Sequence, residues 1–405
     1  MPDGSPVIQR FDSPASAEAL ADLRARLVAT RWPDAPGNAG AVAGAGAGAG
    51  TGAGAGVDWS LGADQGYLRG LVAYWINGFD WPAAEERLAR LPRYRTEVGG
   101  LGIHFVHARA APMPSGRPPL PLLLNHGWPD SFWRYSKVVE LLADPGAHGA
   151  DPDDAFDVIV PDMPGFGYSD APAGRALASP EVAALWAQLM ETLGHDRFVT
   201  AGGDIGSHVS RYLALDFPGR VSAVHRMDAG LPFWEGDPSE LSPAEQRWFE
   251  ASAAWNRAEG AYGAMHRTKP QTAAAALNDS PVGLAAWIVE KLHAWSDGGV
   301  EAYTMDEILT NISIYWLTGT IGSSMRMYNA NAAIPGEQLA RRVDVPSGFS
   351  IFPADIVRPP REWIERSANA VRITEPTRGG HFAPFEQPEL YAAELREFFR
   401  PFRAG

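Results

Sequence analysis

The hydrophobic residues of the chain follow two different periods, and the change from one to the other predicts where its parts begin and end. Up to residue 95 the spacing is helical, as in Leu20, Leu23 and Leu27. We expect helices over residues 16–30, 65–77 and 81–91. From Thr96 the period becomes two, and short apolar runs follow that are typical of strands. The expected strands span residues 103–107, 120–125, 156–161, 197–201 and 221–227.

Helical stretches alternate with these strands and then take over the chain. Residues 133–142, 180–193 and 207–216 have helical spacing, and this alternation predicts an α/β fold with a mostly parallel, doubly wound sheet. Residues 230–335 show helix signals, including a capping box from Ser242 to Glu245. Strand patterns resume at 345–352 and 371–374, before a last helix at 388–399. We therefore expect an N-terminal helical arm at 1–95, two core segments at 96–229 and 336–405, and a helical cap at 230–335.

The composition narrows the functions that are open to the chain. It has 405 residues, no cysteine and a formal net charge of −14. The acidic balance argues against nucleic acid and anionic membranes as partners, and the missing cysteines exclude disulfides, thiolate metal ligands and a cysteine nucleophile. We see no signal peptide, transmembrane helix, metal-ligand spacing or phosphate-binding motif, so we expect a cytoplasmic protein without metal or cofactor. The Ala/Gly-rich segment 39–57 is interpreted as a flexible loop.

One acidic residue stands in a turn between an expected strand and an expected helix. The segment Gly203-Asp204-Ile205-Gly206 has the pattern of a nucleophile elbow, with aspartate where serine is usual. An aspartate nucleophile attacks a saturated carbon and forms an ester. The alternative is that Asp204 only caps the following helix, which aspartate does well. These residues alone do not decide between the two roles.

A second turn follows the strand at 120–125. In the segment His126-Gly127-Trp128-Pro129, a chain reversal would bring the main-chain N–H of Trp128 over the elbow. Together with the N–H of Ile205 it would form an oxyanion hole, and Pro129 allows a cis peptide. A plain turn is the alternative for this motif taken alone.

Two more candidate catalytic residues follow the last two expected strands. Asp355 comes after the strand at 345–352, and His381 stands behind a Gly-Gly turn after the strand at 371–374. The order Asp204, Asp355, His381 is the nucleophile–acid–base order of α/β hydrolases, in which His381 is the base and Asp355 orients it. A single histidine in such a position is more often structural, and the order is what favours catalysis.

Three aromatic residues recur at seven-residue spacing within the expected cap. Trp248, Trp255 and Tyr262 would lie on one face of a helix. Such a stripe is usually core packing, so the pattern alone assigns no role to Tyr262.

Taken together, these motifs resemble the microsomal-type epoxide hydrolases of the α/β-hydrolase superfamily, in a form similar to those of enediyne antibiotic biosynthesis. The resemblance runs from about residue 11 to residue 399. The aromatic N-terminal arm with Trp32-Pro33 is typical of this group. The most specific stretches are residues 126–129, 203–207, 277–286, 309–311, 315–321 and 379–383.

The resemblance implies a two-step hydrolysis that needs no cofactor. Asp204 attacks an oxirane carbon, while Tyr262 and Tyr328 hydrogen-bond the epoxide oxygen and supply a proton. Water activated by His381 then hydrolyses the ester, and a vicinal diol leaves. The partners implied are water and a small-molecule epoxide, aromatic or from secondary metabolism. A biosynthetic and a detoxifying role both stay open, and a homodimer is the assembly that we consider.

Some features depart from the family pattern. Ile205 stands where the family has tryptophan, and Asp355 stands where it has glutamate. We also expect no membrane anchor of the microsomal kind. A haloalkane dehalogenase shares the aspartate nucleophile, but it typically needs an indole N–H right after it, which Ile205 does not provide. A non-catalytic binding protein with this fold is the other alternative, although such proteins commonly lose a catalytic residue.

Overall fold

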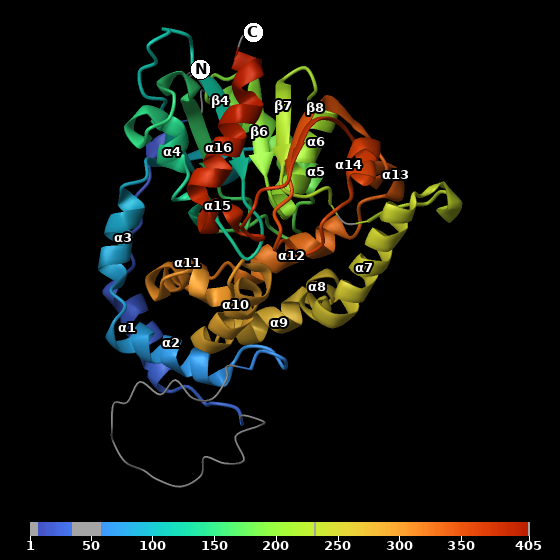
Figure 1. The fold of residues 1–405 in the computed structure, drawn as a ribbon. Helices are drawn as coiled ribbons and strands as arrows, with labels where there is room; N and C mark the ends of the chain where they lie inside the picture. Colours follow the sequence, from blue (N-terminus) through green and yellow to red (C-terminus); the bar gives the residue numbers. More distant parts are fainter. Residues whose placement is uncertain (1–6, 35–57, 231, 404–405) are drawn as a thin grey trace.

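The computed structural model describes residues 7–34, 58–230 and 232–403, and it confirms a mostly parallel sheet flanked by helices (Figure 1). Within these ranges, nine strands form one sheet in the order β1-β2-β3-β5-β4-β6-β7-β8-β9. The strands are β1 (Gln9–Arg10), β2 (Arg93–Val98), β3 (Leu101–Ala108), β4 (Leu120–Asn125), β5 (Phe156–Pro161), β6 (Phe198–Gly202), β7 (Val221–Arg226), β8 (Val343–Ser350) and β9 (Ala368–Thr374).

The sheet has a parallel part and an antiparallel edge. All neighbouring strands from β5 to β9 are parallel, whereas β1, β2 and β3 are added antiparallel. Strands β1 and β2 are not among the expected strands, because residues 1–95 are expected to form a helical arm. Arg93 and Arg95 hide the strand pattern of β2, since arginine usually marks a surface, yet the Arg93 side chain is buried.

Helices cover both faces of the sheet, which explains why its central strands are apolar without alternation. On one face lie α5 (Ser179–Thr192) and α6 (Ile205–Asp216), and on the other α4 (Val139–Ala143) and α16 (Pro388–Phe399). Leu123 of β4 packs in the core cluster of the first face, and its neighbours Leu122 and Leu124 pack in the cluster of the second.

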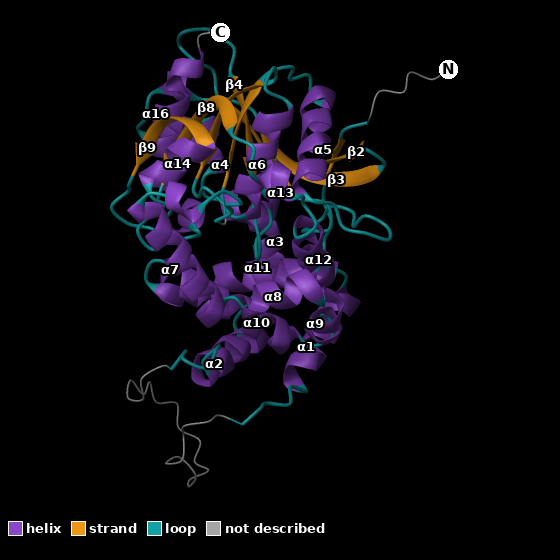
Figure 2. Ribbon diagram, turned by 90° about the vertical axis from the view of Figure 1, so that its right-hand side faces the viewer, coloured by secondary structure: helices purple, strands orange, loops and turns teal. Residues whose placement is uncertain are grey.

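The chain between β7 and β8 contains helices and no strand in its described part, and we call them the inserted helices. The N-terminal helices α1 (Ala17–Val28), α2 (Gln65–Asn77) and α3 (Trp81–Ala89) pack on two helices of this group, α10 (Pro281–Trp295) and α11 (Met305–Thr318) (Figure 2). The inserted helices are η4 (Pro238–Glu240), α7 (Pro243–Glu259), α8 (Ala261–Thr268), α9 (Pro270–Leu277), α10 (Pro281–Trp295), η5 (Gly299–Ala302), α11 (Met305–Thr318), α12 (Ile321–Asn331) and α13 (Gly336–Leu339).

The helix expected over residues 133–142 is wrong. The chain forms a 3-10 turn, η1 (Phe132–Tyr135), and α4 begins only at Val139. The Tyr135 hydroxyl donates to the carbonyl of Asn125 at 2.9 Å, and the Arg134 guanidinium reaches the carbonyl of His381. These tertiary contacts outweigh the helical pattern. The remaining short elements are η2 (Pro145–His148), η3 (Pro152–Asp154), α14 (Arg361–Ser367), α15 (Ala383–Glu386) and η6 (Arg400–Arg403).

Two expectations concern segments outside the sheet. The Ala/Gly-rich loop at 39–57 lies outside the described residues. The capping box is confirmed, since Ser242 Oγ accepts the N–H of Glu245 at 3.2 Å and Glu245 Oε2 accepts that of Ser242 at 2.7 Å. Among the described helices, none is long and apolar enough to cross a membrane.

Candidate active site

Asp204 occupies the turn between β6 and α6, at the carboxyl edge of the parallel strands. Its φ is +57°, and among described non-glycine residues it alone has a positive φ. Two glycines make room for this turn: a Cβ on Gly206 would overlap the carbonyl of Asn125, and a Cβ on Gly202 would overlap that of Gly206. The Asp204 side chain makes no capping hydrogen bond to α6. The capping alternative is therefore not supported, and the backbone strain is of the kind found at functional sites.

The turn after β4 lies directly against the Asp204 carboxylate. The main-chain N–H of Trp128 donates to Asp204 Oδ1 at 2.8 Å, and the Trp128–Pro129 peptide is cis. Gly127 permits this approach, because a Cβ there would overlap the carboxylate. His126 is fully buried, and its Nδ1 lies 3.0 Å from the carbonyl of Gly127. The turn thus presents an N–H donor to the carboxylate, as the sequence predicted.

His381 connects the two carboxylates of the predicted triad. Its Nδ1 lies 2.7 Å from Asp355 Oδ1, and its Nε2 lies 3.5 Å from Asp204 Oδ2. The main-chain N–H of His381 donates to the carbonyl of Trp295 at 2.8 Å, which ties its loop to the inserted helices. The fold therefore brings together three residues that are up to 177 positions apart in the sequence (381 − 204).

The charges of these three side chains depend on one another. Burial disfavours the protonated form of His381, but the carboxylates of Asp355 and Asp204 outweigh it and raise the His381 pKa to about 10. Burial likewise favours the neutral form of Asp204. The hydrogen bond and charge of His381, with the N–H groups of Trp128 and Ile205, nevertheless hold the Asp204 pKa below its usual value. At neutral pH the site thus holds His381 as an imidazolium beside the ionised carboxylate of Asp204.

We expect His381 to become less basic when Asp204 loses its charge. In an Asp204→Asn variant the imidazolium keeps only one carboxylate partner, so the His381 pKa should fall below its wild-type value of about 10. NMR titration of the ring nitrogens in protein labelled with ¹⁵N-histidine would measure this. Asp228→Asn is a matched control, because Asp228 accepts the main-chain N–H of Asp204 at 3.1 Å. An unchanged His381 midpoint in Asp204→Asn would contradict the coupling.

Asp204 and His381 open into a cavity of about 450 Å³, which Tyr262 and Tyr328 also line. The Trp128 indole contacts both phenol rings. It is stacked on the Tyr262 ring, with 5.4 Å between the ring centroids, and it is perpendicular to the Tyr328 ring, with 6.0 Å between the centroids. Burial raises the pKa of both phenols well above the usual value, so both keep their protons. The Tyr328 hydroxyl is buried and has no hydrogen-bond partner. Its proton is therefore available to a ligand in the cavity.

The aromatic stripe of the sequence is divided between two helices. Trp248 and Trp255 lie on α7, which ends at Glu259, and Tyr262 lies on α8. The expectation of one helix face is wrong, because the chain bends at Gly260. All three aromatic side chains line the cavity. They form part of its wall, and their role goes beyond the packing that the spacing suggested.

Three charged residues that hold the His381 loop were not predicted from the sequence. Asp130 and Arg134 form a buried ion pair at 2.5 Å, and Arg134 also donates to the carbonyl of His381. In the sequence this ion pair is visible as an acidic and a basic residue four positions apart, a spacing that is also common on exposed turns. Glu386 is the other missed residue, and its carboxylate accepts three main-chain N–H groups, those of Asp297 at 2.8 Å, Gly380 at 3.1 Å and Phe382 at 2.9 Å.

Known families match most of the chain. The family described as epoxide hydrolase N terminus matches residues 8–135, and the alpha/beta hydrolase fold family matches residues 121–301. A protein of Stigmatella aurantiaca, provisionally assigned as an epoxide hydrolase, is 43% identical over 98% of this chain and 86% of its own length. Epoxide hydrolase 1 of Sus scrofa is 36% identical over 83% of this chain and 80% of its own length.

Solved structures agree with these sequence relatives. The epoxide hydrolase of Aspergillus niger superimposes with a TM-score of 0.82 and 28% identity, covering 98% of this chain and 97% of its own. The juvenile hormone epoxide hydrolase of the silkworm Bombyx mori gives a TM-score of 0.85 and 26% identity, covering 98% and 95%. The similarity thus includes the inserted helices as well as the sheet.

Proposed function

Because the chain belongs to the epoxide hydrolase family of the α/β-hydrolase fold, we propose that it converts an epoxide to a vicinal diol through an ester on Asp204. The observation that carries this proposal is the Asp204 carboxylate, which sits in a strained turn facing the cavity, 3.5 Å from His381 Nε2. Two buried phenols line the same cavity. A carboxylate nucleophile, an acid for the leaving oxygen and a base for water are the groups that this hydrolysis needs.

In the first step, Asp204 attacks one oxirane carbon and the carbon–oxygen bond of the ring breaks. The oxygen leaves as an alkoxide, which is a poor leaving group unless it is protonated. Tyr262 and Tyr328 supply the hydrogen bonds and the proton. Their raised pKa values keep the protons in place until the alkoxide forms. The product of this step is an alkyl ester on Asp204.

In the second step, the ester itself turns His381 into a base. Esterification removes the negative charge of Asp204, one of the two carboxylates that raise the His381 pKa. The imidazolium then loses its proton more easily, to the phenolate left by ring opening, and the neutral ring can take a proton from water. Attack of that water on the ester carbonyl gives a tetrahedral oxyanion. The N–H groups of Trp128 and Ile205 stabilise it. Its collapse breaks the ester C–O bond and restores the Asp204 carboxyl group, while the His381 imidazolium gives its proton to the leaving oxygen of the diol.

We expect the two phenols to share the work of ring opening. Tyr262→Phe or Tyr328→Phe alone should slow ester formation by about tenfold, and the double variant by 10²–10⁴-fold, the usual contribution of a general acid. Rapid-quench mass spectrometry of the Asp204 ester would measure these rates. Tyr94→Phe, a change on β2 at the far edge of the sheet, is the matched control. Ester formation at the wild-type rate in the double variant would contradict the assignment.

The cavity wall suggests an aromatic or secondary-metabolite epoxide as the substrate. Trp248, Trp255 and Trp363 line it with Phe233 and offer flat apolar surfaces. A panel of styrene oxides and aliphatic epoxides, with chiral analysis of the diols, tests this proposal. We expect higher kcat/KM for aryl epoxides, and a preference for small aliphatic epoxides would contradict it. A dehalogenase is not supported, because Ile205 offers the cavity only an alkyl side chain.

The inserted helices take the place of a cap in this proposal. They carry both tyrosines and, through the Trp295 carbonyl, contact the main chain of His381. They would therefore close the cavity over the ester and limit the water that reaches it. A biosynthetic role, the homodimer and the cytoplasmic location stay predictions.

A further inference from the structure

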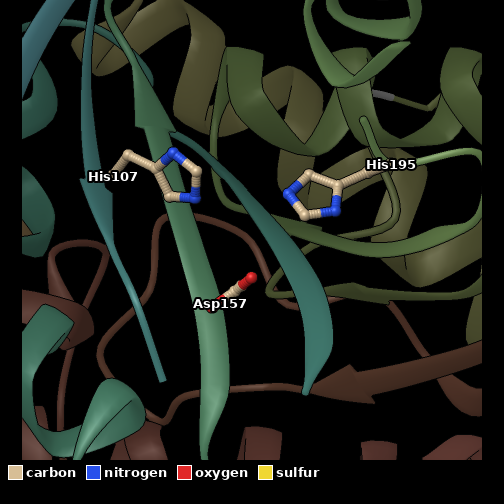
Figure 3. Close-up of side chains that lie close together, drawn as sticks. All are labelled: His107, Asp157 and His195. Carbon is tan, nitrogen blue, oxygen red and sulfur yellow. The ribbon is translucent and has the colours of Figure 1, made fainter. Parts of the chain in front are cut away.

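A second group of polar side chains lies at the other end of the strands from Asp204. His107 is near the end of β3, Asp157 is near the start of β5, and His195 stands in the connection between α5 and β6. Because β3 runs antiparallel to β5, all three residues meet at the amino ends of the parallel strands. Figure 3 shows the two imidazole rings and the carboxylate directed into one space. One potential ligand atom from each residue lies within 4.8 Å of the others.

The two histidines have ring nitrogens that no protein group satisfies. Nε2 of His107 and Nε2 of His195 are both buried without a hydrogen-bond partner. The His107 side chain is well buried, with 6% of its surface exposed. A buried polar atom without a partner destabilises a fold, so two such nitrogens beside a carboxylate favour a ligand bound between them.

We propose that His107, Asp157 and His195 bind a divalent first-row metal ion such as Zn²⁺. Two imidazoles and one carboxylate are ligands that Zn²⁺ prefers, and a water molecule would complete a tetrahedron. Zn²⁺ bonds of about 2.0–2.2 Å set ligand atoms about 3.3 Å apart, so small side-chain rotations would close the site. The ion would join β3, β5 and the connection before β6, far from the Asp204 ester. Its role would be to stabilise the sheet at the amino ends of the parallel strands.

One neighbouring group competes for the same carboxylate. Arg109 donates to Asp157 Oδ2 at 3.1 Å, and the main-chain N–H of Ala110 donates to Oδ1 at 2.9 Å. The Arg109 side chain is 65% exposed, so it can turn into solvent when a metal ion takes its place. Removal of the Arg109 side chain is therefore expected to strengthen metal binding, because a competing cation is lost.

The experiment is a Zn²⁺ titration of the full-length, untagged protein after treatment with a chelator. Calorimetry should show one Zn²⁺ per chain, and Zn²⁺ should raise the Tm. Asp157→Asn and His195→Gln should abolish both effects. His148→Gln, a change of a histidine outside the cluster, should preserve them, and Arg109→Ala should tighten binding several-fold. Circular dichroism of each variant identifies any loss of folding, and the part-buried His195 is the change least disruptive to the core.

Two results would overturn the proposal. One is the absence of stoichiometric Zn²⁺ binding to the wild-type protein. The other is binding that persists unchanged in folded Asp157→Asn and His195→Gln, which would place the ion elsewhere on the surface. Replacement of Zn²⁺ by Co²⁺ gives an independent readout, because a tetrahedral Co²⁺ site with nitrogen and oxygen ligands has intense visible bands. Weak octahedral bands in the wild-type protein would also count against the site.

Discussion

Replacement of Asp204 by asparagine is expected to remove diol formation almost completely. The amide has the size of the carboxylate but is a far weaker nucleophile, so no ester forms on the epoxide carbon. We expect kcat/KM to fall by 10⁴-fold or more, on the order of what other hydrolases lose with their nucleophile. Product analysis of an aryl epoxide under steady-state conditions measures the loss. Turnover of the Asp204→Asn variant at close to the wild-type rate would show that Asp204 is not the nucleophile.

Asparagine is also the right control for the shape of the elbow. Residue 204 has a φ of +57° and a ψ of −133°, a strained backbone, and asparagine keeps the size of the aspartate side chain and an oxygen for the N–H of Trp128. Asp204→Ala should lose the same activity but also some stability, because the N–H of Trp128 then loses its acceptor. Comparison of the two Tm values separates the chemistry of the carboxylate from its contribution to the stability of the turn. Asp228→Asn, beside the elbow, should retain its activity within about tenfold.

Replacement of His381 by glutamine is expected to stop the reaction halfway. In the proposed mechanism, ring opening needs Asp204 and the two phenols, whereas hydrolysis of the ester needs a base for water. The variant should therefore react once with an epoxide and then accumulate the ester, with turnover reduced by about 10⁴-fold. Intact-protein mass spectrometry should show an added mass equal to that of the epoxide. Peptide mapping should place it on Asp204.

The double variant Asp204→Asn/His381→Gln serves as the control for this trap. It has the same change at His381 but lacks the nucleophile, so no adduct should form. An adduct in the double variant would show that another residue is alkylated. Unimpaired turnover in His381→Gln without any adduct would mean that a different group activates water. The proposed role of His381 as the base would then be wrong.

The central strands and the proximity of Asp204, Asp355 and His381 could be predicted because their signals are local. Each parallel strand is a short apolar run, and Asp204, Asp355 and His381 each follow such a run directly. Parallel strands end at one edge of a sheet, so residues that follow different strands meet there without any knowledge of side-chain packing. The glycines around Asp204 added a second local signal, since they indicated a tight turn.

The remaining features depend on contacts between distant segments, which no local pattern contains. Arg134 has a side chain that usually faces solvent, yet it is buried against Asp130 and the carbonyl of His381. The turn at Phe132–Tyr135 replaces the expected helix for the same reason. The group formed by His107, Asp157 and His195 spans three elements, and its members are 50 and 38 positions apart (157 − 107 and 195 − 157). No spacing rule for metal ligands covers such intervals.

The covalent ester on Asp204 is the central claim, and single-turnover hydrolysis in oxygen-18 water tests it most directly. With enzyme in excess over an aryl epoxide, the diol should receive its new oxygen from the unlabelled Asp204 carboxylate. The label should appear in the peptide that contains Asp204, because water attacks the ester carbonyl. Label in the diol of the first turnover, with an unlabelled Asp204 peptide, would show that water attacks the epoxide directly and would contradict the mechanism.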